Sequence, residues 1–101
     1  MNLVEIPIID APFQRLQTVL NDRPVEITLS WSEWAARWSM GLALSGEIVF
    51  QGRRLVPGTD LLQGYGLSLG RLFLVDWAGL GGDPDRAALP AGDFRLIQAS
   101  A

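Results

Sequence analysis

The sequence contains no cysteine, no histidine and no lysine. Without cysteine, the chain can form neither a disulfide bond nor a cysteine-based zinc site. Without histidine and lysine, it lacks the usual general base and the amine that forms Schiff bases, and a Ser-His-Asp triad cannot be built. We therefore predict that the protein is not an enzyme and that it uses no cofactor and no metal.

Positive charge and long apolar segments are also scarce. The eight basic residues, all of them arginine, are outnumbered by eleven acidic residues, which gives a net charge of -3. Proteins that bind nucleic acids usually carry a basic patch, so this balance argues against nucleic-acid binding. No apolar run approaches the ~20 residues that a membrane helix needs, and the first residues do not resemble a signal peptide. We expect a soluble protein that is made in the cytoplasm and binds no membrane.

Apolar residues, in contrast, are abundant. They make up 49% of the sequence and charged residues only 19%, below the ~25% that is typical of soluble domains. Two explanations remain open, a well-filled small core or a surface that partner subunits partly cover. The chain of 101 residues has the usual size of one domain, and we expect residues 1–101 to form a single β domain.

Alternating apolar and polar residues predict strands along most of the chain. The clearest pattern lies in Val25–Leu44, a predicted hairpin with its large apolar side chains on one face. The segment Arg71–Trp77 is apolar on both faces, so we expect it at the centre of a sheet or beneath a partner. The expected strands are Leu3–Ile8, Phe13–Leu20, Val25–Trp31, Arg37–Leu44, Ile48–Gln51, Arg71–Trp77 and Phe94–Gln98.

Two segments do not alternate. Gly52–Gly70 is irregular, and Thr59 or Asp60 can cap one short helical turn over Leu61–Gln63. The segment Ala78–Gly92 carries four glycines and two prolines, so we expect a loop. Six or seven short strands with at most one short helical turn predict an all-β fold, either a small antiparallel β-sandwich or a partly open barrel.

Carboxylates are the remaining side chains that could act in acid–base catalysis. Asp76, Asp83, Asp85 and Asp93 lie in the last quarter of the chain, but aspartates in loops usually form turns or face solvent. A carboxylate-dependent hydrolase that acts through Asp76 or Asp83 is therefore kept only as a third hypothesis.

The four tryptophans supply the clearest candidates for a binding surface. Trp31 and Trp38 belong to the apolar face of the hairpin, and we expect them in the core. Trp34, at the hairpin tip, and Trp77, beside the glycine-rich loop, are candidates for the surface. Exposed tryptophans anchor protein interfaces or stack on sugar rings. We favour a protein interface, and the alternative is a small sugar-binding β module.

Several short motifs in a fixed order resemble one protein family. They are Ile6-Pro7, the extended segment Phe13–Leu20, the hairpin with Trp31 and Trp38, LVPGTDLL at Leu55–Leu62, GRLFLVD at Gly70–Asp76, and a Gly-Gly-Asp-Pro loop before the last strand. Together they resemble the small baseplate plug proteins of contractile-tailed bacteriophages, of the cyanophage type, over nearly the whole chain. LVPGTDLL and GRLFLVD are the most specific of these motifs.

This resemblance implies a structural component of a phage or prophage tail baseplate, located in the virion and made in the host cytoplasm. Such a protein would plug the end of the central hub and tail tube by packing against hub and tail-tube proteins. Hubs of this kind are generally trimeric, so a homo-oligomer, and specifically a trimer, is implied. The family's functional residues are interface surfaces. We expect this interface to include Trp34, Trp77, Arg53, Arg54, Pro57, Gly58, Asp60, Leu61 and Leu62.

Overall fold

The computed structural model describes residues 2–100 of the chain, and of Ser100 the backbone alone. This part folds into seven strands and one short helix. The elements are β1 (Asn2–Ile6), β2 (Phe13–Leu20), β3 (Arg23–Ser32), β4 (Arg37–Leu44), β5 (Glu47–Arg54), β6 (Arg71–Asp76), α1 (Ala88–Ala91) and β7 (Phe94–Ser100).

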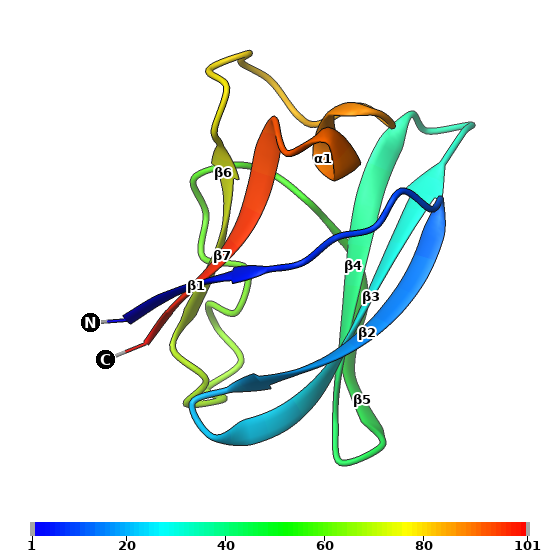
Figure 1. Cartoon of the computed structure of the whole chain (residues 1–101). Coiled ribbons are helices and arrows are strands. Elements are labelled where there is room, and N and C mark those ends of the chain that lie inside the picture. Colours follow the sequence, from blue (N-terminus) through cyan, green and yellow to red (C-terminus); the bar gives the residue numbers. More distant parts are fainter. Residues whose placement is uncertain (1, 101) are drawn as a thin grey trace.

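The strands form two antiparallel sheets that pack face to face (Figure 1). The first sheet has the strand order β1-β7-β6, so it joins the two ends of the described chain. The second has the order β2-β3-β4-β5, a meander in which neighbours in the sequence pair with each other. The prediction of a small antiparallel β-sandwich is therefore confirmed, and within residues 2–100 the sheets do not close into a barrel.

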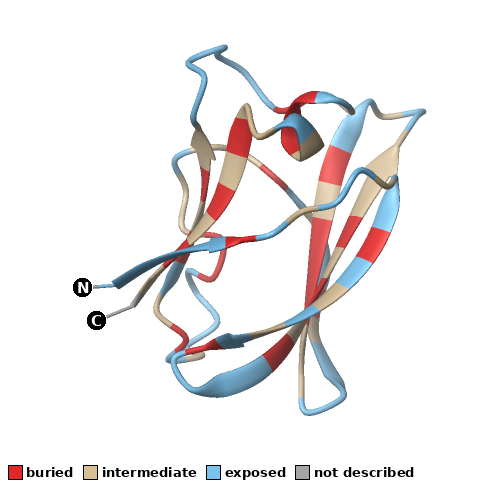
Figure 2. Cartoon of the chain, in the orientation of Figure 1, coloured by how far each residue is buried: buried red, intermediate tan, exposed pale blue. Residues whose placement is uncertain are grey.

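The β3–β4 hairpin supplies much of the core on the side of the second sheet. Its facing pairs of large apolar residues are Val25 and Leu44, Ile27 and Leu42, Leu29 and Met40, and Trp31 and Trp38. All of these residues are buried or half-buried, and Figure 2 shows how buried positions alternate with more exposed ones along the strands. The prediction that Trp38 belongs to the core is confirmed, and Trp31 lies half-buried beside it with 5.6 Å between the ring centroids.

Two-residue turns connect β2 to β3 and β4 to β5. Asn21 and Asp22 have φ values of 50° and 63°, and Ser45 and Gly46 have values of 51° and 82°. Positive φ at both central residues defines a type I′ turn, whose twist matches that of the flanking strands and which favours Asn, Asp and Gly. These turns fix the register of the meander, and with it the side of the sheet on which each side chain lies.

One hydrophobic cluster fills the space between the two sheets, and two glutamine side chains are buried beside it. Gln14 holds the connection between β1 and β2, because its side-chain amide accepts from the Ile9 N–H (3.0 Å) and donates to the Ile9 carbonyl (2.9 Å). Gln98 of β7 donates to the Asn21 side chain (3.2 Å) and to the Leu69 carbonyl (3.0 Å). Each buried amide is thus paired, as burial of a polar group requires.

β6 lies at the edge of its sheet, so the expectation of a central position was wrong. The side that does not pair with β7 is covered by residues 57–61 of the same chain. The Gly58 N–H donates to the Leu74 carbonyl (3.2 Å), and the Leu61 N–H donates to the Leu72 carbonyl (2.7 Å). This cover protects the edge from pairing with another strand.

The helix also lies elsewhere than the sequence pattern placed it. α1 falls inside Ala78–Gly92, which was expected to be a loop, whereas Leu61–Gln63 form a turn that is not helical. The Asp85 carboxylate starts α1 by accepting from the Ala88 N–H (2.8 Å), and Gly92 ends it with a φ of 89°. At four residues, α1 is too short to cross a membrane, and residues 2–100 hold no longer helix.

Candidate protein interface

Trp34 stands at the tip of the β3–β4 hairpin, and 97% of its surface is exposed. In the connection that carries it, the Ala35 N–H donates a hydrogen bond to the Ser32 hydroxyl oxygen (3.0 Å). Ala36 has a left-handed backbone conformation, with a φ of 53°. An indole that is this exposed adds little to the stability of its own chain, because apolar area stabilises only when it leaves water. The ring is therefore fully available to a partner.

Trp77 follows β6 directly and is 58% exposed. The guanidinium carbon of Arg95, on β7, lies 4.3 Å from the centroid of its ring, within the range of a cation–π contact. The same guanidinium pairs with the Glu5 carboxylate of β1 at 3.3 Å. One face of the indole is thus occupied by an arginine that is itself held in place.

The connection that begins at Trp77 is ordered by the carboxylate of Asp76. Its two oxygens accept hydrogen bonds from the Leu80 N–H (3.0 Å) and the Gly81 N–H (2.7 Å). Leu80 is exposed like Trp77. The loop thus presents two apolar side chains on a backbone that is fixed before any partner binds.

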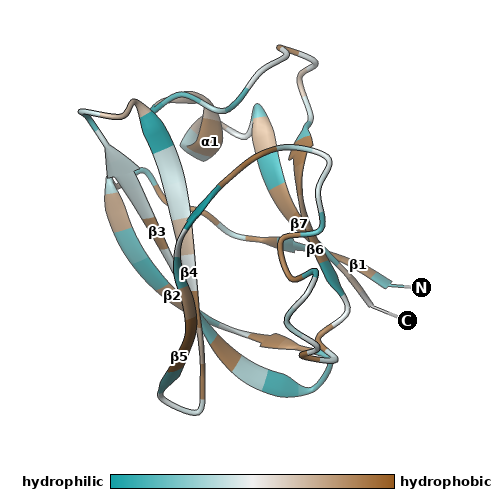
Figure 3. Cartoon of the chain, turned by 180° about the vertical axis from the view of Figure 1, so that it is seen from behind, coloured by the Kyte–Doolittle hydropathy of each residue, from teal (hydrophilic) through white to brown (hydrophobic). Residues whose placement is uncertain are grey.

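The β3–β4 and β6–α1 connections lie at the same end of the sandwich, the end that carries α1 (Figures 1 and 3). An ion pair between Arg54, the last residue of β5, and Asp83 joins a third element to the β6–α1 connection. We call this end, with Trp34 on one connection, Trp77 and Leu80 on the other and Arg54 at the end of β5, the α1-end surface. Three of the residues that the sequence had nominated for an interface belong to the elements at this end.

Arg53 belongs to a different surface, although it neighbours Arg54 in the sequence. Its guanidinium carbon lies 5.9 Å from the centroid of the Tyr65 ring, which stacks on Phe50 with 4.7 Å between centroids. Successive side chains of a strand point to opposite faces, so the two arginines separate.

Pro57, Gly58 and Asp60 lie along the outer edge of β6, where Pro57 bridges to Leu74 and Asp60 to Phe73. Gly58 and Asp60 line a shallow hollow of about 540 Å³ beside Arg71. The hollow lies beside β6, whose residues Arg71 and Phe73 also line it.

Leu61 and Leu62 do not belong to any surface. They are 0% and 5% exposed and pack in the hydrophobic core. The Asp60 carboxylate turns the chain inward at this point by accepting hydrogen bonds from the Leu62 N–H (3.0 Å) and the Leu72 N–H (3.1 Å). We therefore remove these two leucines from the set of interface residues.

The loop carboxylates act as structural ligands of the backbone or of arginine. Asp76 and Asp85 accept backbone N–H groups, and Asp83 pairs with Arg54. Among the described residues, no three Asp or Glu side chains form a group that could hold a metal ion. These contacts favour a structural role over a catalytic one for Asp76, Asp83 and Asp85.

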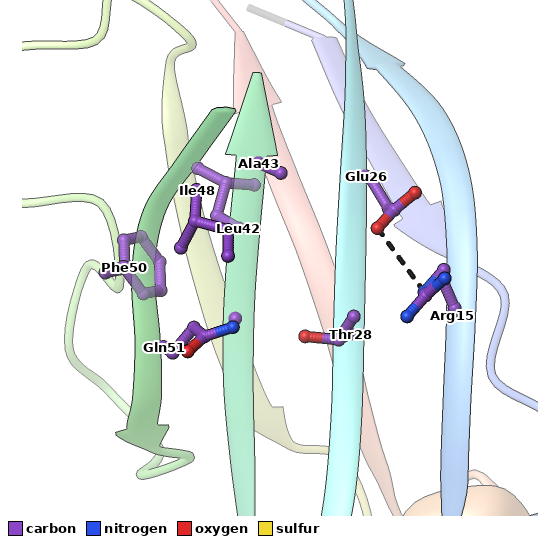
Figure 4. Close-up of a pocket in the computed structure, with 9 residues that line it drawn as sticks. Arg15, Glu26, Thr28, Leu42, Ala43, Ile48, Phe50 and Gln51 are labelled. Atoms are coloured by element: carbon purple, nitrogen blue, oxygen red, sulfur yellow. Dashed lines mark ion pairs between the residues drawn. The ribbon is translucent and has the colours of Figure 1, made fainter. Parts of the chain in front are cut away.

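The sequence analysis missed a groove on the outer face of the second sheet. Two adjoining hollows, of about 500 Å³ and about 100 Å³, share Arg15, Glu26, Ala43 and Ile48. Figure 4 shows Arg15 and Glu26 on one side and Ile48 and Gln51 on the other. The floor is low because Gly41 and Ala43 of β4 carry almost no side chain. These two small residues can be seen in the sequence, at the outward-facing positions of the predicted strand Arg37–Leu44. They were the one sign of the groove that the sequence offered.

The fold and these surfaces define a small antiparallel β-sandwich that displays aromatic and arginine side chains on ordered loops. A comparison with protein families identifies it further: the model described as cyanophage baseplate Pam3 plug gp18 matches residues 3–101. The chain therefore belongs to this family of phage baseplate plugs and is a structural component of a phage tail baseplate. No curated protein matches the sequence.

Proposed function

We propose that the protein closes the end of the central hub and tail tube as a trimer that packs against hub and tail-tube proteins. The observation that carries this proposal is the α1-end surface, where Trp34 and Trp77 are displayed on ordered connections. Membership of a baseplate plug family supports the use of such a surface for packing against other baseplate proteins. Function then rests on non-covalent packing, without catalysis, a cofactor or nucleic-acid binding.

The geometry suits a component that binds by rigid contact. Ordering side chains and loops on binding costs about 0.5–1.5 kcal/mol for each mobile side chain. The hydrogen bonds of Asp76 and the Arg95 contact have already ordered the Trp77 loop. Tryptophan and arginine are also the residues most enriched among interface hot spots. The proposed contacts with other baseplate proteins comprise Trp34, Trp77 and Arg54 at the α1 end, Arg53 on a separate surface, and Pro57, Gly58 and Asp60 beside β6.

The first experiment is mass spectrometry of purified contractile-tail particles from the source cells. We expect a few copies of the chain per particle, together with hub and spike proteins. Absence from intact particles would contradict a permanent place in the baseplate and would leave a role in assembly.

Site-directed variants then test the interface in the assembled particle. Trp77→Ala is expected to lower the copy number per particle at least about tenfold, because truncated hot spots commonly cost that much affinity. Leu3→Ala is the matched control, since Leu3 is also apolar and exposed but lies on β1. An equal loss for both variants would show that the α1-end surface has no special role.

A sugar-binding module is the alternative that the exposed tryptophans raise. Stacking on a sugar needs a free ring face, and Arg95 occupies one face of Trp77. Titration of the intrinsic fluorescence with a panel of glycans is expected to give no saturable change. A saturable shift that disappears in Trp34→Ala or in Trp77→Ala would favour the sugar-binding module.

A further inference from the structure

Arg95 lies on the outer face of the first sheet, where it can contact the strands on both sides. β7, which carries it, is the middle strand of that sheet, between β1 and β6. Its neighbours in the sequence, Phe94 and Leu96, are buried in the core. Because successive side chains of a strand point to opposite faces, the Arg95 side chain is directed away from the core and lies over the sheet.

Two hydrogen bonds fix the guanidinium group of Arg95. Its Nε donates to the carbonyl of Gly92, at the end of α1 (3.1 Å), and its Nη1 donates to the Glu5 carboxylate on β1 (3.3 Å). Since the guanidinium is planar, bonds from two different nitrogens determine both its position and the direction of its plane. An arginine that is anchored at two points in this way can support a third group.

The third group is the indole of Trp77. Its ring centroid lies 4.3 Å from the guanidinium carbon of Arg95, well inside the limit of about 6 Å for a cation–π contact. Arg95 thus joins β1, the end of α1 and the residue that follows β6.

The backbone at Trp77 is held independently of this contact. Asp76 forms the last pair of the β6–β7 ladder, and the Ala78 N–H donates to the Asp93 carbonyl (3.0 Å). A fixed backbone still leaves an exposed side chain free to change between staggered rotamers. Trp77 is 58% exposed, so burial in the core does not hold its ring. The contact with Arg95 is therefore the one that selects an orientation of the indole.

We propose that Arg95 is a positioning residue of Trp77, which holds the indole in one orientation before a baseplate partner binds. This inference rests on the proposed use of Trp77 in the interface. A ring that is already ordered avoids the cost of ordering a mobile side chain on binding. Glu5 and Gly92 act on the interface through Arg95, because they fix the guanidinium on which the ring lies.

NMR of the indole N–H groups tests the positioning in the purified chain. Order parameters report motion on the picosecond-to-nanosecond timescale. The buried Trp38 is the rigid reference, and Trp34, which is 97% exposed, is the mobile one. In wild type, the value for Trp77 is expected to lie near that of Trp38. In Arg95→Ala it is expected to fall below about 0.6, the range of flexible groups, while Trp38 stays unchanged. A general loss of stability would not mobilise one ring alone.

Further variants separate the anchors of Arg95 from its charge. Arg95→Lys keeps the charge but loses the planar group, so it is expected to leave Trp77 mobile. Glu5→Ala removes one anchor and is expected to give an intermediate order parameter. It also takes the place of Arg95→Ala if that variant does not fold. Arg15→Ala is the matched control, because Arg15 pairs with Glu26 at a similar distance (3.4 Å) on the second sheet, and it is expected to leave Trp77 unchanged.

Competition during assembly tests the consequence for binding. Particles are assembled from equal supplies of the wild-type chain and one variant, and mass spectrometry measures the ratio of the two in purified particles. Arg95→Ala is expected to be under-represented about two- to tenfold, the factor that corresponds to ordering one side chain on binding. In a chain that already carries Trp77→Ala, the same change is expected to have no further effect, because no indole is left to position.

The inference is overturned if the order parameter of Trp77 is the same in Arg95→Ala as in wild type. It is also overturned if Arg95→Ala competes as well as wild type while Trp77→Ala does not, or if Arg95→Ala causes an equal further loss in the Trp77→Ala chain. Equal competition by Trp77→Ala itself would contradict the proposed function instead, and the NMR result would then decide the positioning role alone.

Discussion

Trp34 and Trp38 lie four residues apart, yet one indole is 97% exposed and the other 1% exposed. Trp38 packs against Trp31, and its ring N–H donates to the Asp85 carbonyl at 2.9 Å. It therefore joins the second sheet to the loop before α1. The register of one hairpin thus exposes the first tryptophan and buries the second.

Alanine substitutions should separate these two roles. Trp34→Ala is expected to change the free energy of unfolding by less than about 0.5 kcal/mol, as exposed substitutions usually do. Trp38→Ala should cost about 3–5 kcal/mol, because it leaves a cavity in the core. Urea unfolding measures both values. A large loss of stability in Trp34→Ala would place that ring in the core.

Position 41 requires glycine because neighbouring atoms lie too close to it for a Cβ atom, and not because of its backbone angles. An added Cβ atom would lie 2.5 Å from the Thr28 hydroxyl oxygen and 3.4 Å from the Phe50 carbonyl oxygen. We expect Gly41→Ala to destabilise the chain by about 1–3 kcal/mol, the usual cost of overpacking.

The double variant Thr28→Ala/Gly41→Ala tests this cause, because it removes the nearer atom. It is expected to recover most of the lost stability in urea unfolding, relative to Thr28→Ala alone. No recovery would show that the Phe50 carbonyl, or the sheet itself, limits the space at this position.

At the scale of elements, the segment 57–62 shows how one carboxylate docks a loop on a strand. Asp60 accepts from the N–H groups of Leu62 and Leu72 through one oxygen. Asp60→Ala leaves both donors without their acceptor and should cost about 1.5–3 kcal/mol, the range for hydrogen bonds to charged groups. Asp60→Asn keeps an oxygen in place and should cost less. Hydrogen exchange at the Leu72 amide measures the docking directly, and equal losses for the two variants would contradict this role.

The strands were predictable wherever burial is one-sided. β3 and β4 bury one face each, so their alternation showed both the strands and the inward side chains. β6 is apolar on both faces. That pattern indicates that both faces are buried, but it does not show which part of the protein covers them. Its cover is a loop of the same chain, which no local pattern can identify. α1 has four residues, barely one turn, so no helical period was present to detect.

The candidate site was predictable in part, because the strand pattern also shows where strands end and side chains become exposed. Trp34 and Trp77 fall where the strand pattern stops, and both are exposed. Leu61 and Leu62 also lie outside a strand, yet Asp60 turns them into the core. The groove depends on side-chain sizes on four strands at once, so it becomes visible only when the register is known. The interface role of these residues remains a proposal.

At the scale of the whole molecule, the two sheets share one core. The hydrophobic cluster takes residues from both, and the side chain of Gln98 on β7 donates to Asn21 in the β2–β3 turn. The indole N–H of Trp38 adds a second polar link between β4 and the connection that leads to α1. Neither sheet can therefore lose its partner without exposing apolar surface and unpaired polar groups.

This shared core predicts that the chain unfolds in a single cooperative transition. The slowest amides of β3 and β7 should exchange with the same opening free energy, equal to that from urea unfolding, because only global opening exposes them. Gln98→Ala should lower both values together, since it removes a buried donor that serves both sheets. Leu3 and Val4 of the exposed edge strand serve as the internal comparison and should exchange faster. A lower opening free energy in β1, β6 and β7 alone would show that the sandwich opens one sheet at a time.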